Sequence, residues 1–455
     1  MKFRLKLKLD LNNNLNKSYF FIQIMISKFL SISKAIKKGS GKVAVRGWVY
    51  RERGSNALKF IVLRDSSDII QCVLKKESFE KQWDDIDKLQ VEASLEIEGT
   101  IKEDKRAPTG YEISVEKINI IGTSDSFPIN KDLNEELLGD RRHLWLRSRK
   151  MSAILKIRST VMQSFRDYFR EDGFYEFQSP IIIPGGAEDG PTMFEVDYFG
   201  KKMYLCQTWQ LYAEAAIYGL EKIYGIGPTF RAEKSKTSRH LTEFWMAEME
   251  VAWANLNDIM DYAEGMTKYI IKKVMEENKK ELEILERDIK KLEPSLKKKF
   301  PRITYDEALK ELKNKKMNVP WGKDLRTIEE EKLMDSYDTP IFVTHYPKEA
   351  MAFYKPKDPK NPRVALCFDM LGPEGNGELI GGSERDTNVE ELKKALKAKG
   401  EKLEDYSYYF DIHSYGAVPH AGFGLGPERL IKWICGLDTV KDAIAFPRTM
   451  TRMKP

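Results

Sequence analysis

Apolar and polar side chains alternate along the chain between residues 40 and 123. Alternation with period two places successive side chains on opposite faces of a sheet, so each run predicts a half-buried strand. Gly, Ser-Asn and Pro-Thr-Gly turns separate the runs, and the segment 78–89 is expected to be helical. The pattern predicts a small closed barrel of the kind typical of oligonucleotide-binding folds, with strands at residues 42–50, 57–65, 68–74, 91–99 and 111–121.

The spacing of apolar residues changes after residue 150. Residues 151–172 and 256–277 have the spacing of amphipathic helices, and 278–300 is a Lys/Glu-rich segment that we expect to be a solvated helical insertion. Residues 362–385 predict two strands around a Gly-rich turn. The chain is therefore predicted to be α+β, with a small barrel followed by a larger mixed domain.

Composition and charge add little to this picture. Of the 455 residues 42% are hydrophobic, which suffices for a sizeable core and excludes a wholly disordered chain. The net charge is +6, but residues 1–24 carry five basic groups and one acid, so most of the surplus lies there. We predict that residues 1–24 are a disordered extension and that the folded protein begins near Met25. Total charge therefore does not identify a partner.

The four cysteines lie far apart and form no Cys-x-x-Cys pair. This spacing argues against a cysteine zinc site or a disulfide framework and favours free thiols in a reducing cytoplasm. No apolar run reaches the roughly 18 residues of a membrane span, so we expect no membrane association.

One candidate site is the segment Phe230-Arg-Ala-Glu-Lys-Ser with the following segment Arg239-His-Leu-Thr-Glu-Phe. If the first segment is a strand, Arg231 and Glu233 share a face. A guanidinium, acids and an aromatic ring on one sheet surface suit a nucleotide, although an exposed ion-paired edge has the same composition. The next strand adds, on one face, Phe244, Met246, Glu248 and Glu250.

Two further motifs carry candidate chemistry. Gly422-Phe-Gly-Leu-Gly-Pro-Glu-Arg429 is a Gly-rich entry to a helix, and helix N-termini favour anions. Asp369 and Glu378 flank the Gly-rich turn of the predicted hairpin, just before Gly381-Gly-Ser-Glu-Arg385. Two carboxylates on neighbouring strands suit Mg²⁺, which takes few protein oxygens plus substrate phosphates; a plain acidic hairpin is the alternative.

Together and in this order behind a barrel, these motifs resemble those of class II aminoacyl-tRNA synthetases, over residues 25–455. Ser179-Pro180 is similar to the dimer-forming first motif of that class. The Arg239 segment and the barrel resemble the aspartyl, asparaginyl and lysyl subgroup. Three segments resemble those of archaeal-type asparaginyl enzymes: Val319-Pro-Trp-Gly, Phe342-Val-Thr-His-Tyr-Pro-Lys-Glu and the tail 446–455.

The resemblance implies a domain plan and partners. Residues 25–124 are expected to form an OB-fold that binds the anticodon, with Phe60 and Gln71 at its central base. A connection at 125–147 is expected to lead to a catalytic domain at 148–455, an antiparallel sheet flanked by helices. The implied partners are asparagine, tRNA(Asn) and a second copy of the chain in a homodimer. A core phenylalanine and a solvated glutamine remain the alternatives for the two barrel residues.

The amino-acid substrate is predicted from one substitution. Aspartyl enzymes carry Gln-Ser-Pro-Gln-Leu-Tyr-Lys, and this chain has Gln207-Thr-Trp-Gln-Leu-Tyr-Ala, so Ala213 stands where the lysine would be. Loss of that cation disfavours a buried carboxylate by several kcal/mol, whereas an amide does not need it. Arg385 can donate to an amide oxygen, and Glu248 can accept from its N–H and repel aspartate. We therefore expect asparagine.

The resemblance also implies site residues for ATP, Mg²⁺ and the amino acid. Arg231 is expected at the α-phosphate, His240 at the γ-phosphate, and Phe244 with Arg429 on the two faces of adenine. The catalytic set is Arg231, Glu233 and Arg429. The residues expected to bind ATP are Arg231, Glu233, His240, Phe244, Glu378 and Arg429. Asp369 and Glu378 are expected to bind Mg²⁺. The residues expected to bind the amino acid are Glu188, Gln210, Glu248 and Arg385.

The sequence leaves alternatives open for the role of His240 and for the function of the chain. His240 is a surface histidine in the competing interpretation. Glu384 and Trp209 depart from the residues that relatives of this kind carry, glutamine and proline. An aspartyl enzyme that charges both tRNAs, an asparagine synthetase on the same fold and a non-catalytic RNA-binding paralogue are the rival functions.

Overall fold

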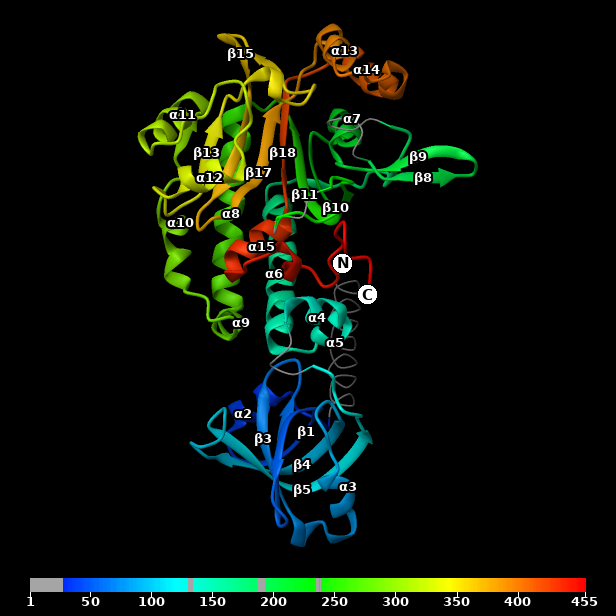
Figure 1. Ribbon diagram of the computed structural model, residues 1–455, viewed down its shortest axis with the longest axis vertical. Helices are drawn as coiled ribbons and strands as arrows, with labels where there is room; N and C mark the ends of the chain where they lie inside the picture. Colours follow the sequence, from blue (N-terminus) through cyan, green and yellow to red (C-terminus); the bar gives the residue numbers. More distant parts are fainter. Residues whose placement is uncertain (1–27, 130–133, 186–192, 235–236, 238) are drawn as a thin grey trace, which may run out of the picture. The chain divides into compact units, whose positions relative to one another are not determined.

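The computed structural model describes residues 28–129, 134–185, 193–234, 237 and 239–455. These residues belong to two compact units, Met1–Asn134 and Glu135–Pro455, and each is described by itself. The predicted extension at 1–24 lies outside the described residues. Figure 1 shows the first unit in blue and cyan and the second from cyan through red.

The first unit is a closed five-stranded barrel with the strand order β1-β2-β3-β5-β4. Strands β3 and β5 pair in parallel, and the other pairs in the barrel are antiparallel. The predicted barrel is therefore confirmed. Its strands are β1 (Gly41–Gly54), β2 (Leu58–Arg64), β3 (Ile69–Lys75), β4 (Ser94–Glu103) and β5 (Tyr111–Gly122).

Alternating burial along the strands produces the barrel core. In β2 every second residue is buried, so Ile61 and Leu63 point inward while Phe60 and Val62 stay half-exposed. Helix α2 (Ile32–Lys38) covers the core, with Ser31 as its N-cap and Gly39 in the left-handed conformation at its C-cap. Between β3 and β4 lie the short helices η1 (Lys76–Ser78), η2 (Glu80–Gln82) and α3 (Trp83–Asp87).

The second unit is built on an eight-stranded sheet. The strand order is β12-β13-β16-β17-β18-β11-β10-β6. It is antiparallel from β13 to β10, as predicted, and the pairs at its two edges, β12–β13 and β10–β6, are parallel. The strands are β6 (Tyr175–Glu176), β10 (Lys222–Phe230), β11 (Glu243–Ala252), β12 (Arg302–Thr304), β13 (Ile341–Thr344), β16 (Cys367–Gly372), β17 (Gly377–Glu384) and β18 (His420–Leu425).

Three helices bury their apolar faces on this sheet: α6 (Arg149–Glu171), α8 (Leu256–Glu277) and α15 (Pro427–Cys435). The first two agree closely with the helices predicted at 151–172 and 256–277. The segment 278–300 is helical as predicted, in α9 (Lys279–Ile284), η3 (Ile289–Lys291) and α10 (Glu293–Lys297). It is not simply solvated, because Leu282, Leu292 and Phe300 belong to the same core.

The remaining elements surround the sheet. Figure 1 shows β8 and β9 as a hairpin projecting to one side of the unit, near α7. None of the helices in the described part of the chain is both long and apolar enough to cross a membrane. The helices are α7 (Gln210–Leu220), α11 (Tyr305–Asn314), α12 (Thr327–Met334), η4 (Lys348–Ala350), α13 (Val389–Ala398), η5 (Leu403–Tyr406), α14 (Ser407–Ser414) and η6 (Val440–Ala443), and the strands are β7 (Ile182–Ile183), β8 (Glu195–Tyr198), β9 (Lys201–Leu205), β14 (Lys357–Asp358) and β15 (Asn361–Ala365).

The segment 125–147, expected to be a connection, is partly helical. Helices α4 (Glu135–Asp140) and α5 (Arg142–Trp145) lie within it and belong to the second unit. The reason is the buried Arg142 guanidinium, which forms a 3.0 Å ion pair with Asp442. It also donates to three carbonyl oxygens, those of Lys441, Ile444 and Ala445. The boundary between the compact units therefore falls between residues 134 and 135.

Candidate active site

Three neighbouring strands, β11, β18 and β17, align the site residues in rows. Strand register places Glu250 beside Gly422 and Gly422 beside Ser383. A Cβ atom at Gly422 would lie 2.3 Å from Cδ of Glu250, so only glycine lets β18 pass over this carboxylate. The next row, two residues along, joins Glu248, Gly424 and Gly381.

The six residues expected to bind ATP all line one pocket over these strands. The pocket lies beside the β10–β11 hairpin and the start of α15, and its lining includes Arg231, Glu233, His240, Phe244, Glu378 and Arg429. Strand β10 ends at Phe230, so Arg231 and Glu233 do not share a face of a strand, and that part of the prediction is wrong. They lie instead in the loop that follows, where the Arg231 guanidinium is 5.5 Å from the Phe244 ring.

Arg429 is fixed by the first turn of α15. Proline stands at the beginning of this helix, and the Arg429 guanidinium donates to the Glu378 carbonyl at 2.8 Å and to its carboxylate at 3.0 Å. Burial opposes ionisation of Glu378, but the positive charges of Arg429 and Arg231 outweigh it and lower the pKa of Glu378. The pocket therefore combines cations, an ionised carboxylate and an aromatic ring.

The loop that carries His240 is anchored by Arg239, a residue of the predicted motif for which no separate role was predicted. The Arg239 guanidinium pairs with Glu330 at 3.0 Å and Glu331 at 2.9 Å, both on α12, and donates to the Gly375 carbonyl at 2.7 Å. Burial and then the nearby Glu378 raise the pKa of Glu330 to about 7. His240 is half-buried in the pocket, and burial and Arg429 lower its pKa, so its imidazole is neutral at neutral pH.

Asp369 and Glu378 lie on the paired strands β16 and β17, as predicted, and both line a second pocket that adjoins the first. Asp324 and Lys355 line it too, and no motif in the sequence had indicated either residue. Burial, Glu378 and Asp324 raise the pKa of Asp369 well above its usual range. Crowded carboxylate oxygens of this kind fit Mg²⁺, because a divalent cation relieves their mutual repulsion.

Arg385 also lines the second pocket. Its Nη1 donates to the Ser383 hydroxyl at 2.7 Å, and its Nε donates to a Glu250 oxygen at 3.1 Å, with a second contact from Nη2 to the same carboxylate. The guanidinium lies 5.2 Å from the Tyr354 ring centre. Both members of the Arg385–Glu250 pair are buried, with 7% and 1% of their surfaces exposed. Arg385 therefore lines the pocket, while Glu250, which is not among the lining residues, pairs with the guanidinium and balances its charge.

Glu248 and Gln210 line the same pocket. The Glu248 carboxylate accepts from the Thr208 hydroxyl at 2.5 Å and from the backbone N–H of Trp209 at 3.0 Å, so it holds the beginning of α7 in place. Gln210 donates from its side chain to Glu214, one helical turn later, at 2.8 Å.

Comparison with known proteins identifies the family. Residues 134–450 match the family model described as tRNA synthetases class II (D, K and N), and residues 43–121 match that of the OB-fold nucleic acid binding domain. The chain belongs to the class II tRNA synthetases of this group. Over 94% of its length it is 48% identical to the whole asparagine–tRNA ligase of Thermoplasma acidophilum.

Solved structures agree with this synthetase fold. The chain resembles asparaginyl-tRNA synthetase from Pyrococcus horikoshii complexed with asparaginyl-adenylate, with a TM-score of 0.91, 42% identity and coverage of 94% of this chain and 100% of that one. It also resembles the Entamoeba histolytica asparaginyl-tRNA synthetase in complex with asparaginyl-adenylate, with a TM-score of 0.85, 32% identity and the same coverage.

The structure places Ala213, on which the prediction of asparagine was based, away from the synthetase's amino-acid pocket. Ala213 packs into an apolar cluster with Trp209, Ile217 and Ile223 and is not among the residues that line the pocket. The residue of α7 that lies near Arg385 is Glu214, 3.9 Å from the guanidinium Nε. Glu188 lies outside the described residues.

The two departures from relatives have structural partners. Trp209 donates from its indole N–H to the Phe177 carbonyl at 2.8 Å. Glu384 accepts from the Leu256 backbone N–H at 2.9 Å, at the beginning of α8. Both side chains therefore form hydrogen bonds to the backbone of neighbouring segments of the synthetase.

The predicted anticodon residues share the outer face of the β2–β3 hairpin. Phe60 pairs with Val73, and Gln71 pairs with Val62, which places these side chains on one face. Phe60 is half-buried beneath the Arg53 guanidinium, 5.1 Å away, and does not belong to the core. Gln71 is buried and donates to Glu112 at 3.0 Å, so it is not a solvated glutamine.

Proposed function

We propose that this synthetase is an asparagine–tRNA ligase that acts in translation. The asparagine carboxylate attacks the α-phosphorus of ATP, which yields asparaginyl-adenylate and releases pyrophosphate. The 3′-terminal ribose hydroxyl of tRNA(Asn) then takes the asparaginyl group, and AMP leaves. Relatives named asparagine–tRNA ligase, which the chain matches over more than nine-tenths of its length, support this proposal.

The observation that carries the choice of asparagine is the buried Arg385–Glu250 pair. A carboxamide side chain offers one acceptor and one donor, so it can accept from Arg385 and donate to Glu248, and both of these residues line the pocket. An aspartate side chain offers only acceptors and would bring a second carboxylate to Glu248 and to the Arg385 guanidinium, whose charge Glu250 already balances. A site with unmatched buried polar groups rejects the wrong ligand strongly.

The adenylation step needs alignment and charge neutralisation more than a protein nucleophile. In our proposal Arg231 holds the α-phosphate, His240 approaches the γ-phosphate, Glu233 contacts ATP, and Phe244 and Arg429 enclose adenine. Asp369 and Glu378 would hold Mg²⁺, which neutralises phosphate charge when bound. The position of all these residues in two adjoining pockets supports the assignment.

The barrel is proposed to bind the tRNA anticodon. Unstacked bases are recognised by aromatic stacking and by hydrogen bonds at their edges. Phe60 offers a half-exposed ring and Gln71 an amide on the same face of the barrel. The match of residues 43–121 to a nucleic acid binding domain supports this part of the proposal.

We further propose that the enzyme is a homodimer in the cytoplasm. Large apolar side chains remain exposed near strand β6, the edge of the sheet, and near the Ser179-Pro180 motif. Among them are Tyr175 at 59%, Ile181 at 42% and Ile182 at 37% exposure. A second copy of the chain covering this edge would bury them. All four cysteines are free thiols, in keeping with a reducing compartment.

The experiment is ATP–pyrophosphate exchange with asparagine and with aspartate, followed by charging of purified tRNA(Asn). We expect exchange with asparagine to exceed that with aspartate by orders of magnitude. Comparable exchange with aspartate would contradict the assignment and indicate an aspartyl enzyme. Formation of asparagine from aspartate and ammonia without tRNA would indicate an asparagine synthetase.

A further inference from the structure

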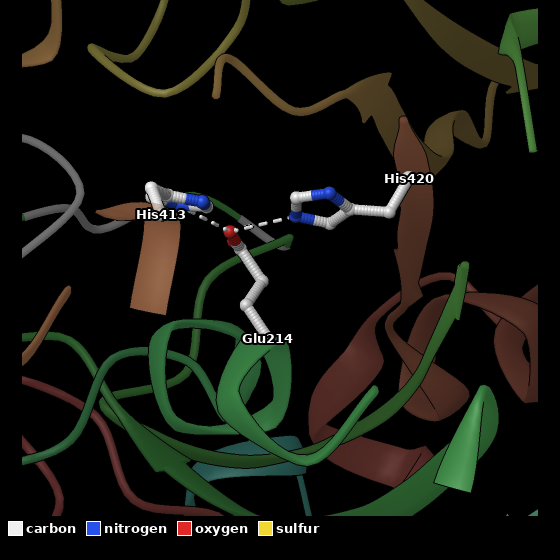
Figure 2. A group of neighbouring side chains, drawn as sticks. All are labelled: Glu214, His413 and His420. Atoms are coloured by element: carbon white, nitrogen blue, oxygen red, sulfur yellow. Dashed lines mark hydrogen bonds and ion pairs between the residues drawn. The ribbon is translucent and has the colours of Figure 1, made fainter. Parts of the chain in front are cut away.

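Glu214, His413 and His420 form a buried cluster beside the amino-acid pocket. They come from three elements, α7, α14 and β18, and Figure 2 shows the two imidazoles converging on the Glu214 carboxylate. The Oε2 atom of Glu214 lies 3.1 Å from Nε2 of His420 and 3.7 Å from Nε2 of His413, and all three side chains are fully buried.

We infer that this cluster is a binding site for Zn²⁺ or a similar divalent cation, with Nε2 of His413, Nε2 of His420 and a carboxylate oxygen of Glu214 as ligands. Two imidazole nitrogens and one carboxylate oxygen form a donor set that zinc accepts and that magnesium disfavours. The site is separate from the proposed Mg²⁺ carboxylates Asp369 and Glu378 and from the ATP pocket.

The hydrogen bonds on the other ring nitrogens orient both imidazoles as ligands. Nδ1 of His420 lies 2.8 Å from the Val418 carbonyl oxygen, which only accepts, so this nitrogen carries a hydrogen. Nδ1 of His413 lies 3.4 Å from the Tyr218 hydroxyl. Histidines that bind metals are held in this way, with Nδ1 on an oxygen and Nε2 toward the ion.

The distances fit a small ion with limited adjustment. The three ligand atoms all lie within 4.8 Å of one another. Around an ion with bonds of about 2.1 Å, tetrahedral ligand atoms are roughly 3.4 Å apart, between the two observed separations from the carboxylate. The Tyr409 hydroxyl donates to Glu214 at 2.6 Å, and the Gln210 side chain donates to it at 2.8 Å. These two hydrogen bonds orient the carboxylate, as hydrogen bonds to the ligands of a metal site commonly do.

A proton on the cluster is the alternative to a metal ion, and one buried atom without a hydrogen-bond partner in the described part of the chain favours the metal ion. A proton on Nε2 of His420 would give an imidazolium paired with Glu214. That arrangement leaves Nε2 of His413 fully buried, and this atom has no hydrogen-bond partner among the residues that the structure describes. A buried nitrogen without a partner is costly. A cation in the cluster uses this nitrogen as well as the other two ligands.

The test measures metal binding by the purified full-length chain. The chain is stripped with a chelator and titrated with Zn²⁺, or with Co²⁺ as a spectroscopic substitute, in excess Mg²⁺ to occupy the carboxylate site. We expect one ion per chain and visible Co²⁺ bands of a tetrahedral site. His413→Gln should weaken Zn²⁺ binding by about 100-fold or more, whereas the same change at the exposed His143 should leave it unaltered.

A second variant guards against a fold defect. His413→Cys should retain Zn²⁺ and add a thiolate-to-cobalt charge-transfer band, which a purely structural histidine cannot produce. Less than a tenth of an equivalent of bound metal in the unsubstituted chain would overturn the inference. Equal Zn²⁺ affinity in the folded His413→Gln chain, or a Co²⁺ complex of His413→Cys without the new band, would overturn it as well.

Discussion

Replacement of Glu250 by glutamine tests how the site distinguishes an amide from an acid. The substitution keeps size and an acceptor but removes one negative charge from the pair with Arg385. The guanidinium then carries a charge that no longer has its 3.1 Å partner. An aspartate carboxylate is a better match for that charge than an asparagine amide. We therefore expect the preference for asparagine to fall.

The magnitude follows from the separation of the two carboxylates that would share Arg385. At about 5 Å and an effective dielectric constant of about 20, two like charges repel by roughly 3 kcal/mol. Water in the open pocket reduces this value, and 1.4 kcal/mol corresponds to a tenfold change. The ratio of kcat/KM for asparagine to that for aspartate should fall by about 10- to 100-fold in Glu250→Gln.

The assay is pyrophosphate exchange at saturating ATP over a range of each amino acid. Glu243→Gln, the same change at an exposed position of the same strand, is the matched control and should keep the ratio. Thermal unfolding of both variants shows whether the buried change has damaged the fold. A folded Glu250→Gln enzyme with an unaltered ratio would refute the reasoning, because the charge of Glu250 would then play no part in selection.

Three further outcomes are expected. Arg429→Ala should raise KM for ATP by about tenfold or more with little change in KM for asparagine, and a parallel rise in both constants would contradict the placement of Arg429 at the nucleotide. Phe60→Ala should raise KM for tRNA in charging while pyrophosphate exchange stays unchanged, and slower exchange would count against an anticodon role. Because the pKa of His240 is lowered from 6.5, the folded chain binds this proton less readily than the unfolded one. The neutral His240 side chain therefore contributes its full stability above pH 6.5, and this contribution declines as the pH falls below 6.5. His240→Asn should accordingly flatten the acid side of a plot of unfolding free energy against pH.

The barrel was predictable because its information is local. Alternation of apolar residues and short turns specifies strands such as β2, and the inward phase of Ile61 places Phe60 on the outer face. Helix α8 was equally clear, since its apolar stripe runs through one continuous segment. The pocket that we propose for ATP was predicted differently, from the resemblance of the motifs around Arg231 and Arg429 to those of a known family, because these two residues lie far apart in the sequence.

Local sequence patterns could not predict contacts between residues that lie far apart along the chain. Asp324 comes from a loop before α12 and joins Asp369 only when the sheet has formed. Ala213 was interpreted from its position in a motif, but helical phase turns it toward the apolar cluster and brings Glu214 near Arg385 instead. The helices in the segment 125–147 were missed because their stability depends on Arg142, whose partners lie about 300 residues further along the chain.

The position of those partners determines when the catalytic unit can be completed during synthesis. Arg142 receives its carboxylate and carbonyl oxygens from residues 441–445, within the last 15 residues of the chain. The tail also contacts the loop end of the β10–β11 hairpin, where the Thr242 N–H donates to the Arg448 carbonyl at 2.9 Å. The barrel, whose contacts are made by residues near the N-terminus, can fold on the ribosome while translation continues. The catalytic unit can be completed only after residues 441–445 have been synthesised, and a chain that terminates before residue 441 lacks these partners of the buried Arg142.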